Sequence, residues 1–209
     1  MTLSEKYMKA GKITAFCYAQ TPVAQPKILW RKYMRKALVT GGNTKFGRSL
    51  VDYLRIKFEV TLIKREDLIN GDVDKYEGAY DLVIFNHNTM PTNIDAETIQ
   101  RDCLVCQDIL QWASDPSCDF KQKVVWMLSS GIGGKSMPNL MPYWMCKSIN
   151  LHIMRYYAYL YDEIYIGIDP ERLVESNYPQ QAVSMINLLE RDDLESGKVY
   201  KLNGSVSGL

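Results

Sequence analysis

Residues Ala37-Leu38-Val39-Thr40-Gly41-Gly42-Asn43-Thr44-Lys45-Phe46-Gly47 join a short apolar run to a helical pattern through a glycine-rich turn. The apolar run predicts a strand over 37–39. The residues that recur at helical spacing after the turn predict a helix over 46–58, and they are Phe46, Leu50, Leu54 and Phe58. A glycine turn between a strand and a helix offers backbone N–H groups to a phosphate at the positive end of the helix.

The rest of the chain repeats this alternation of strand and helix. Apolar runs typical of parallel strands that are buried on both faces lie at 60–63, 82–85, 124–128, 164–168 and 198–202. Helical periodicity predicts helices over 96–113, 143–161 and 182–189. With right-handed crossovers, this alternation predicts an α/β fold, a Rossmann-type doubly wound parallel sheet with helices on both faces.

The composition indicates one soluble globular domain preceded by an extension. The chain has 209 residues, of which 46% are hydrophobic, and a formal net charge of +1. This charge gives no reason to expect a nucleic-acid or membrane partner. We expect residues 1–35 to form an N-terminal extension, an arm or an oligomer contact, and residues 36–209 to form the Rossmann-type domain. A separate binding element is the alternative for the extension, because basic residues gather near its end.

The sequence does not predict export, a membrane span or a metal site. No apolar run approaches the ~20 residues that cross a bilayer. The first residues lack the layout of a signal peptide, so we expect a cytoplasmic protein. The five cysteines are an odd number and are expected to be reduced thiols. Cys103 and Cys106 form a C-x-x-C inside a predicted helix, without the second pair of ligands that a zinc site needs.

The turn at 40–47 resembles that of the short-chain dehydrogenase/reductase family, which carries T-G-x-x-x-G-x-G at this place. Thr40, Gly41 and Gly47 match the pattern, whereas Lys45 replaces its middle glycine. A lysine here can reach a phosphate as a point charge. The cofactor-binding residues of the turn implied by the resemblance are Gly41, Asn43, Thr44, Lys45, Phe46 and Gly47.

Two cations follow the predicted second strand and favour NADP over NAD. Lys64 stands 23 positions after Gly41, and Arg65 follows it, near the place where an acidic residue would hold the adenosine ribose of NAD. Cations there favour a 2′-phosphate, so we expect NADP as cofactor, with NAD possible; a solvated pair of surface charges is the structural alternative. Further cofactor contacts implied by the resemblance are Asp72, Val73, Asn86 and Pro170.

Tyr143 and Lys147 form a Y-x-x-x-K at the start of a predicted helix. Positions i and i+4 share one helix face, so the phenol and the ammonium can face the same cleft. A nearby ammonium stabilises the phenolate and lowers the pKa of a tyrosine, which can then exchange a proton with a substrate oxygen. Ser130 ends a buried strand 13 residues before Tyr143. The family has its serine at this spacing, so the resemblance implies that Ser130 positions the substrate oxygen and that Lys147 also holds the nicotinamide ribose.

Together these features predict an NADP-preferring oxidoreductase that interconverts a carbonyl and an alcohol on a small-molecule substrate, with Tyr143 as general acid/base. One alternative is an NADP-binding regulatory or interaction protein that kept the fold and lost efficient catalysis. Several departures from the family motivate it: Lys45, Phe85, Asn88, Glu171 and the missing helix asparagine near Asp102. Another alternative is an isomerase or epimerase with bound cofactor.

The resemblance also implies an oligomer. Family members pair through two long helices, which correspond here to 96–113 and 143–161. We therefore expect a homodimer or homotetramer. Met154, Tyr157 and Leu160 are candidate contacts, although the same residues would equally suit a core.

Overall fold

A computed structural model describes residues 34–87, 91, 93–113, 122–129, 132, 138–170, 173 and 175–209. The described part belongs to one compact unit, Met34–Leu209. Apart from its last two positions, the predicted extension lies outside the described residues, so its role stays a prediction.

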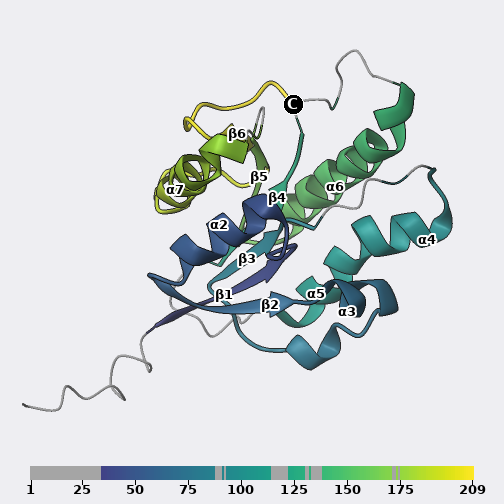
Figure 1. Cartoon of the computed structure of the whole chain (residues 1–209), viewed down its shortest axis with the longest axis horizontal. Helices are drawn as coiled ribbons and strands as arrows, with labels where there is room; N and C mark the ends of the chain where they lie inside the picture. The colour runs from purple at the N-terminus through teal and green to yellow at the C-terminus, as the bar shows by residue number, and fades with distance from the viewer. Residues whose placement is uncertain are drawn as a thin grey trace, which may run out of the picture. The chain divides into compact units, whose positions relative to one another are not determined.

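In the described residues, six parallel strands form one sheet in the order β2-β1-β3-β4-β5-β6. The strands are β1 (Arg35–Thr40), β2 (Phe58–Ile63), β3 (Leu82–Phe85), β4 (Lys123–Met127), β5 (Ile164–Asp169) and β6 (Val199–Lys201). From β1 the chain moves to β2 on one side and then to β3 on the other, so the winding reverses between β1 and β3 (Figure 1). The predicted doubly wound sheet is confirmed.

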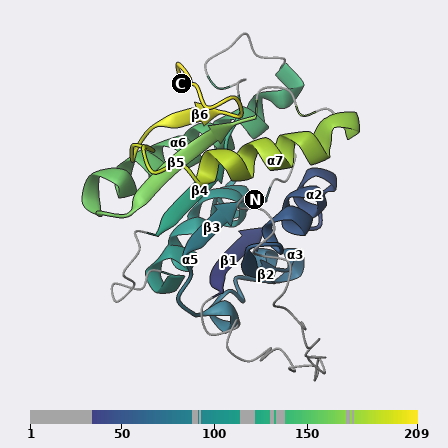
Figure 2. The same cartoon turned by 90° about the vertical axis from the view of Figure 1, so that its left-hand side faces the viewer.

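Helices cover both faces of this sheet (Figures 1 and 2). One face packs against α2 (Lys45–Leu54) and α7 (Tyr178–Leu189). The helical elements on the other face are α3 (Arg65–Asn70), α4 (Ala96–Ile99), the π-helical turn η2 (Gln100–Leu104), α5 (Val105–Ala113) and α6 (Met141–Leu160). Three short 3₁₀ turns complete the described elements: η1 (Asp74–Tyr76), η3 (Pro138–Leu140) and η4 (Glu175–Asn177). Within the described ranges, no helix combines the length and the apolar character needed to cross a bilayer.

Alternate positions of each central strand face opposite layers. In β1, Ala37 and Val39 join the core beneath α2 and α7, whereas Leu38 joins the core beneath α5 and α6. The strands therefore need apolar side chains at every position, which explains why these runs show no polar alternation.

The helix predicted over 46–58 is wrong at its C-terminal end. α2 ends at Leu54, and Phe58 is the first residue of β2. The Phe58 side chain is only 7% exposed, because it packs into the core and lies under the Arg35 guanidinium, whose Cζ is 4.5 Å from the ring centroid. The apolar residues at helical spacing therefore belong to two elements, α2 and β2, that pack into the same core.

Candidate active site

The glycine-rich turn after β1 is pressed against the residues that follow β3. Gly41 has a φ of 65°, and a Cβ at this position would lie 2.4 Å from the backbone oxygen of Asn86. A Cβ at Gly47 would lie 2.2 Å from the Gly41 oxygen. The buried Asn86 amide donates from Nδ2 to the same Gly41 oxygen at 3.1 Å. Glycine is therefore required at both positions, and Asn86 holds the turn in place.

Thr44 caps α2 next to this turn. Its Oγ1 accepts from the Gly47 N–H at 3.0 Å and donates to the Gly41 oxygen at 2.9 Å. Helix geometry leaves the N–H groups of Lys45 and Phe46 without acceptors inside the helix. The first turn of α2 contains no acidic residue. Backbone N–H groups and the helix dipole together make this end of α2 suitable for a phosphate. The Phe46 side chain is in the core, so only its backbone is available.

Thr40, the last residue of β1, contacts both the backbone and the ring of His87. The buried Thr40 Oγ1 accepts from the N–H groups of Asn86 and His87 at 3.0 and 3.1 Å, and lies 2.7 Å from His87 Nδ1. The Thr40 hydroxyl also donates to the Ile84 backbone oxygen at 3.4 Å. Desolvation, and secondly the Lys147 ammonium, lower the pKa of His87 to about 4. The ring is therefore neutral at pH 7.

A cavity of about 260 Å³ opens at the carboxyl ends of β1, β2 and β3, where the winding of the sheet reverses. Ligands of open α/β sheets bind at such a place. The lining comprises the turn 41–44, an apolar group and a polar group. The apolar group is Ile63, Leu68 and Ile69, and the polar group is Arg65, His87, Arg101 and Asp102.

The other cofactor residues predicted from the sequence lie elsewhere among the described residues. Lys45 Nζ contacts both carboxylate oxygens of Glu175 at 2.8 and 2.9 Å, so a phosphate contact would require this pair to separate. Lys64 and Asp72 are exposed outside the cavity lining, and Val73 and Pro170 are buried. Their cofactor contacts stay predictions.

Tyr143 and Lys147 lie one turn apart at the start of α6. Lys147 Nζ donates to the Met127 oxygen at the end of β4 at 2.6 Å, and lies 5.7 Å from the centroid of the Tyr143 ring. The Lys147 side chain is buried, and desolvation lowers its pKa to about 8. The lysine therefore remains mainly a cation at pH 7. Predicted Ser130 lies outside the described residues, as do Asn88 and Glu171.

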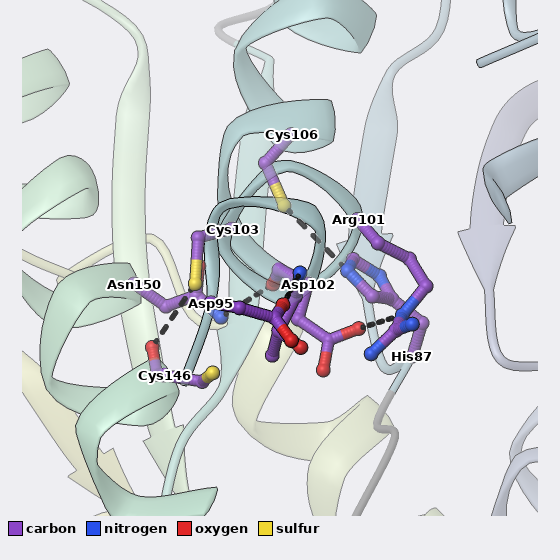
Figure 3. A network of polar contacts seen from close by, with 9 residues as sticks. His87, Asp95, Arg101, Asp102, Cys103, Cys106, Cys146 and Asn150 are labelled. Atoms are coloured by element: carbon purple, nitrogen blue, oxygen red, sulfur yellow. Dashed lines mark hydrogen bonds and ion pairs between the residues drawn. The ribbon is translucent and has the colours of Figure 1, made fainter. Parts of the chain in front are cut away.

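A buried polar network connects α6, η2 and His87 (Figure 3). Asn150 of α6 donates from Nδ2 to the Asp102 backbone oxygen at 3.1 Å, and the Asp102 carboxylate accepts from Arg101 Nε at 3.0 Å. Cys103 Sγ lies 3.6 Å from the Cys146 oxygen, and Cys106 Sγ lies 4.0 Å from His87 Nε2. Among the described side chains, no group of three or more histidines, cysteines or carboxylates is arranged to hold a metal ion.

Comparisons with known proteins identify the fold. No family model matches the sequence, and no curated protein matches it significantly. Solved structures do match. The structure of 4-hydroxyisoleucine dehydrogenase complexed with NADH and succinate shares 17% identity at a TM-score of 0.61, over 81% of this chain and 98% of that one. A short-chain dehydrogenase/reductase from Saccharomyces cerevisiae shares 13% at 0.59, over 81% and 96%. A short-chain dehydrogenase family protein from Francisella tularensis shares 16% at 0.57, over 80% and 96%.

This chain has the short-chain dehydrogenase/reductase fold. Within that fold, the cleft contains two charged residues that the sequence did not single out as cofactor contacts, Arg101 and Asp102. Both belong to η2, which interrupts a segment that reads from its sequence as one regular helix. A basic residue near the middle of that segment is the only sequence signal, and it is indistinguishable from a solvated surface charge.

Proposed function

We propose that this protein is an NADP-preferring oxidoreductase that interconverts a carbonyl and an alcohol, with Tyr143 as general acid/base. The observation that carries the proposal is the Lys147 ammonium, which is buried within 6 Å of the Tyr143 ring and hydrogen-bonded to the end of β4. Carboxyl ends of parallel strands share one edge of the sheet. This pair therefore lies at the same edge as the nucleotide cleft.

The described side of the cleft suits the adenosine diphosphate part of a nicotinamide dinucleotide. The first turn of α2 can receive the diphosphate, and the apolar group Ile63, Leu68 and Ile69 can receive the adenine ring. Arg65 lines the same cavity and suits a 2′-phosphate. The fold alone does not decide between the two cofactors, since the neighbour 4-hydroxyisoleucine dehydrogenase holds NADH. The proposed preference for NADP therefore depends on the Arg65 guanidinium. When bound, the cofactor supplies the hydride transfer.

The residues of this chain supply the proton chemistry. In the reductive direction, the Tyr143 hydroxyl donates its proton to the carbonyl oxygen of the substrate as charge develops there. The Lys147 ammonium stabilises the phenolate that remains, because an opposite charge nearby favours the ionised form. Ser130 holds the substrate oxygen during this step. In the oxidative direction, the phenolate removes the hydroxyl proton of the alcohol.

The decisive experiment combines a panel of carbonyl compounds with the Tyr143→Phe variant. We expect Tyr143→Phe to lower turnover by about 10²- to 10⁴-fold and to leave the dissociation constant for NADPH nearly unchanged. Tyr159→Phe, at the exposed end of the same helix, is the matched control and should behave as wild type. Undiminished turnover in Tyr143→Phe would exclude the proposed role. Wild-type protein that binds NADPH but turns over no carbonyl or alcohol would favour the regulatory alternative.

A further inference from the structure

The nucleotide cleft contains a second guanidinium, beyond the one assigned to the 2′-phosphate. Arg101 lines the same cavity as Arg65 and the glycine turn, although it comes from η2 whereas Arg65 begins α3. η2 is a π-helical turn, and π turns within α-helices occur frequently at functional sites. The turn places two successive residues, Arg101 and Asp102, on one cavity.

Arg101 is held in a defined orientation. Its Nε donates to Asp102 Oδ1 at 3.0 Å, and the Asp102 carboxylate is almost fully buried. Asp102 is in turn tied to α6 through the bond from Asn150 to its backbone oxygen. A guanidinium is planar and presents its donors as a rigid fork, so fixing Nε also fixes the direction of the plane. Figure 3 shows Arg101 beside His87 at the border of the network.

The charges of the cleft indicate which ligand this guanidinium suits. The cations in its described lining are Arg65 and Arg101, the anion is Asp102, and His87 is neutral. Lys45 is paired with Glu175, and Lys64 does not belong to the lining. Two guanidinium groups therefore share a cavity with three aliphatic side chains. Adenosine with a phosphate on its ribose matches this combination. The phosphate suits the two guanidinium groups, and the flat adenine ring suits the aliphatic side chains.

We propose that Arg101 is a second specificity-determining residue for the cofactor, which clamps the 2′-phosphoadenosine end of NADP together with Arg65. α3 supplies one guanidinium and η2 the other, so the phosphate is bound between two separate helical elements. The inference rests on the proposed function, because it assumes that the cleft binds a nicotinamide dinucleotide. It adds a residue that lies outside the motifs matched in this sequence.

The test compares the binding of NADPH and NADH to the full chain by fluorescence titration. Arg101→Gln should weaken NADPH binding by about 10- to 100-fold, since bonds between charged groups are lost. NADH binding should change by less than about threefold, because NADH lacks the 2′-phosphate. Arg55→Gln, at the far end of α2, is the control and should leave both affinities unchanged.

A second set of variants separates recognition from folding. Arg101→Gln leaves the buried Asp102 carboxylate without this guanidinium, so Arg101→Gln combined with Asp102→Asn removes both charges. Arg101→Lys keeps a cation and loses the planar fork, and its NADPH affinity should lie between those of wild type and Arg101→Gln. Calorimetry with adenosine 2′,5′-bisphosphate and with ADP then tests the same selectivity without the nicotinamide half.

The outcomes are distinct. A loss confined to the 2′-phosphorylated ligands, in whichever of these variants folds, supports the clamp. Equal weakening of NADPH and NADH, or no change in either, overturns it while leaving the proposed function intact. Wild-type protein that binds neither dinucleotide overturns the proposed function and the clamp together.

Discussion

The two faces of the sheet are built in different ways. The face beneath α2 and α7 is an apolar core in which Leu50 and Met185 are completely buried. The face beneath η2 and α6 also buries polar side chains, among them Asp102, Lys147 and Asn150. Burying a polar group costs free energy unless it is hydrogen-bonded, and a charge costs more. Both faces therefore contribute an apolar core, but one of them gives up part of that stability to hold the candidate active site.

Burial of charged groups on this face shifts their pKa values. Desolvation lowers the pKa of Lys147 to about 8 and that of His87 to about 4. In both groups the folded protein disfavours the protonated form. Groups with perturbed pKa values gather at functional sites, and here both lie on the polar face or at its edge. Substitutions on each face test this contrast.

The largest effect is expected on the apolar face. Leu50→Ala should lower the free energy of unfolding by about 3 kcal/mol, because it leaves a cavity in a closed core. Ile56→Ala is the control, since Ile56 follows α2 and is 71% exposed, and its change should stay within about 0.5 kcal/mol. Urea unfolding measures both. A loss below about 1 kcal/mol for Leu50→Ala would contradict the assignment of stability to this face.

His87 should make the protein sensitive to acid. The unfolded chain binds a proton near pH 6.5, whereas folded His87 resists protonation down to about pH 4. Acid therefore favours the unfolded state, and between pH 6.5 and 4.5 wild type should lose about 2 kcal/mol relative to His87→Gln. The chain has 2 histidines, so His152→Gln, at an exposed position of α6, is the matched control and should follow wild type. Identical acid profiles for wild type and His87→Gln would argue against a desolvated ring.

Lys147 should produce a smaller effect of the same sign in the alkaline range. Folded Lys147 loses its proton near pH 8, well before the unfolded lysine does. Stability should therefore rise with pH, and between pH 8 and 9 wild type should gain about 1 kcal/mol relative to Lys147→Met. Lys198→Met, at an exposed position, should show no such difference. If Lys147→Met keeps the wild-type slope, the ammonium is better solvated than the buried geometry indicates.

The smallest effect is expected at the exposed ion pair between Lys45 and Glu175. Lys45→Gln should leave the melting temperature unchanged within error, because exposed pairs contribute little. The dissociation constant of the Lys45→Gln variant for NADPH should exceed that of wild type by less than about threefold if wild-type Lys45 stays paired with Glu175. An increase of about tenfold or more would instead show that Lys45 leaves Glu175 to bind a phosphate, as the sequence predicted.

Local patterns in the sequence were sufficient for most of the fold. Every predicted strand is present, because apolar runs record burial directly. The i, i+4 spacing of Tyr143 and Lys147 also places them on neighbouring turns of α6. α3 was not predicted, since six residues are too few to show a period. The end of α2 was misplaced because Phe58 contacts the same core from a strand.

The order of the elements, the glycine turn and the tyrosine–lysine spacing follow from the amino-acid sequence, because each depends on residues close together in the chain. Which charges meet in the cleft follows from the packing of distant segments. Lys64 and Arg65 are adjacent in sequence, yet only Arg65 lines the cavity. Arg101 reaches it through a π turn that leaves no periodic signal. The burial that lowers the pKa of His87, and its contact with Thr40, likewise arise only when β1 and β3 lie side by side.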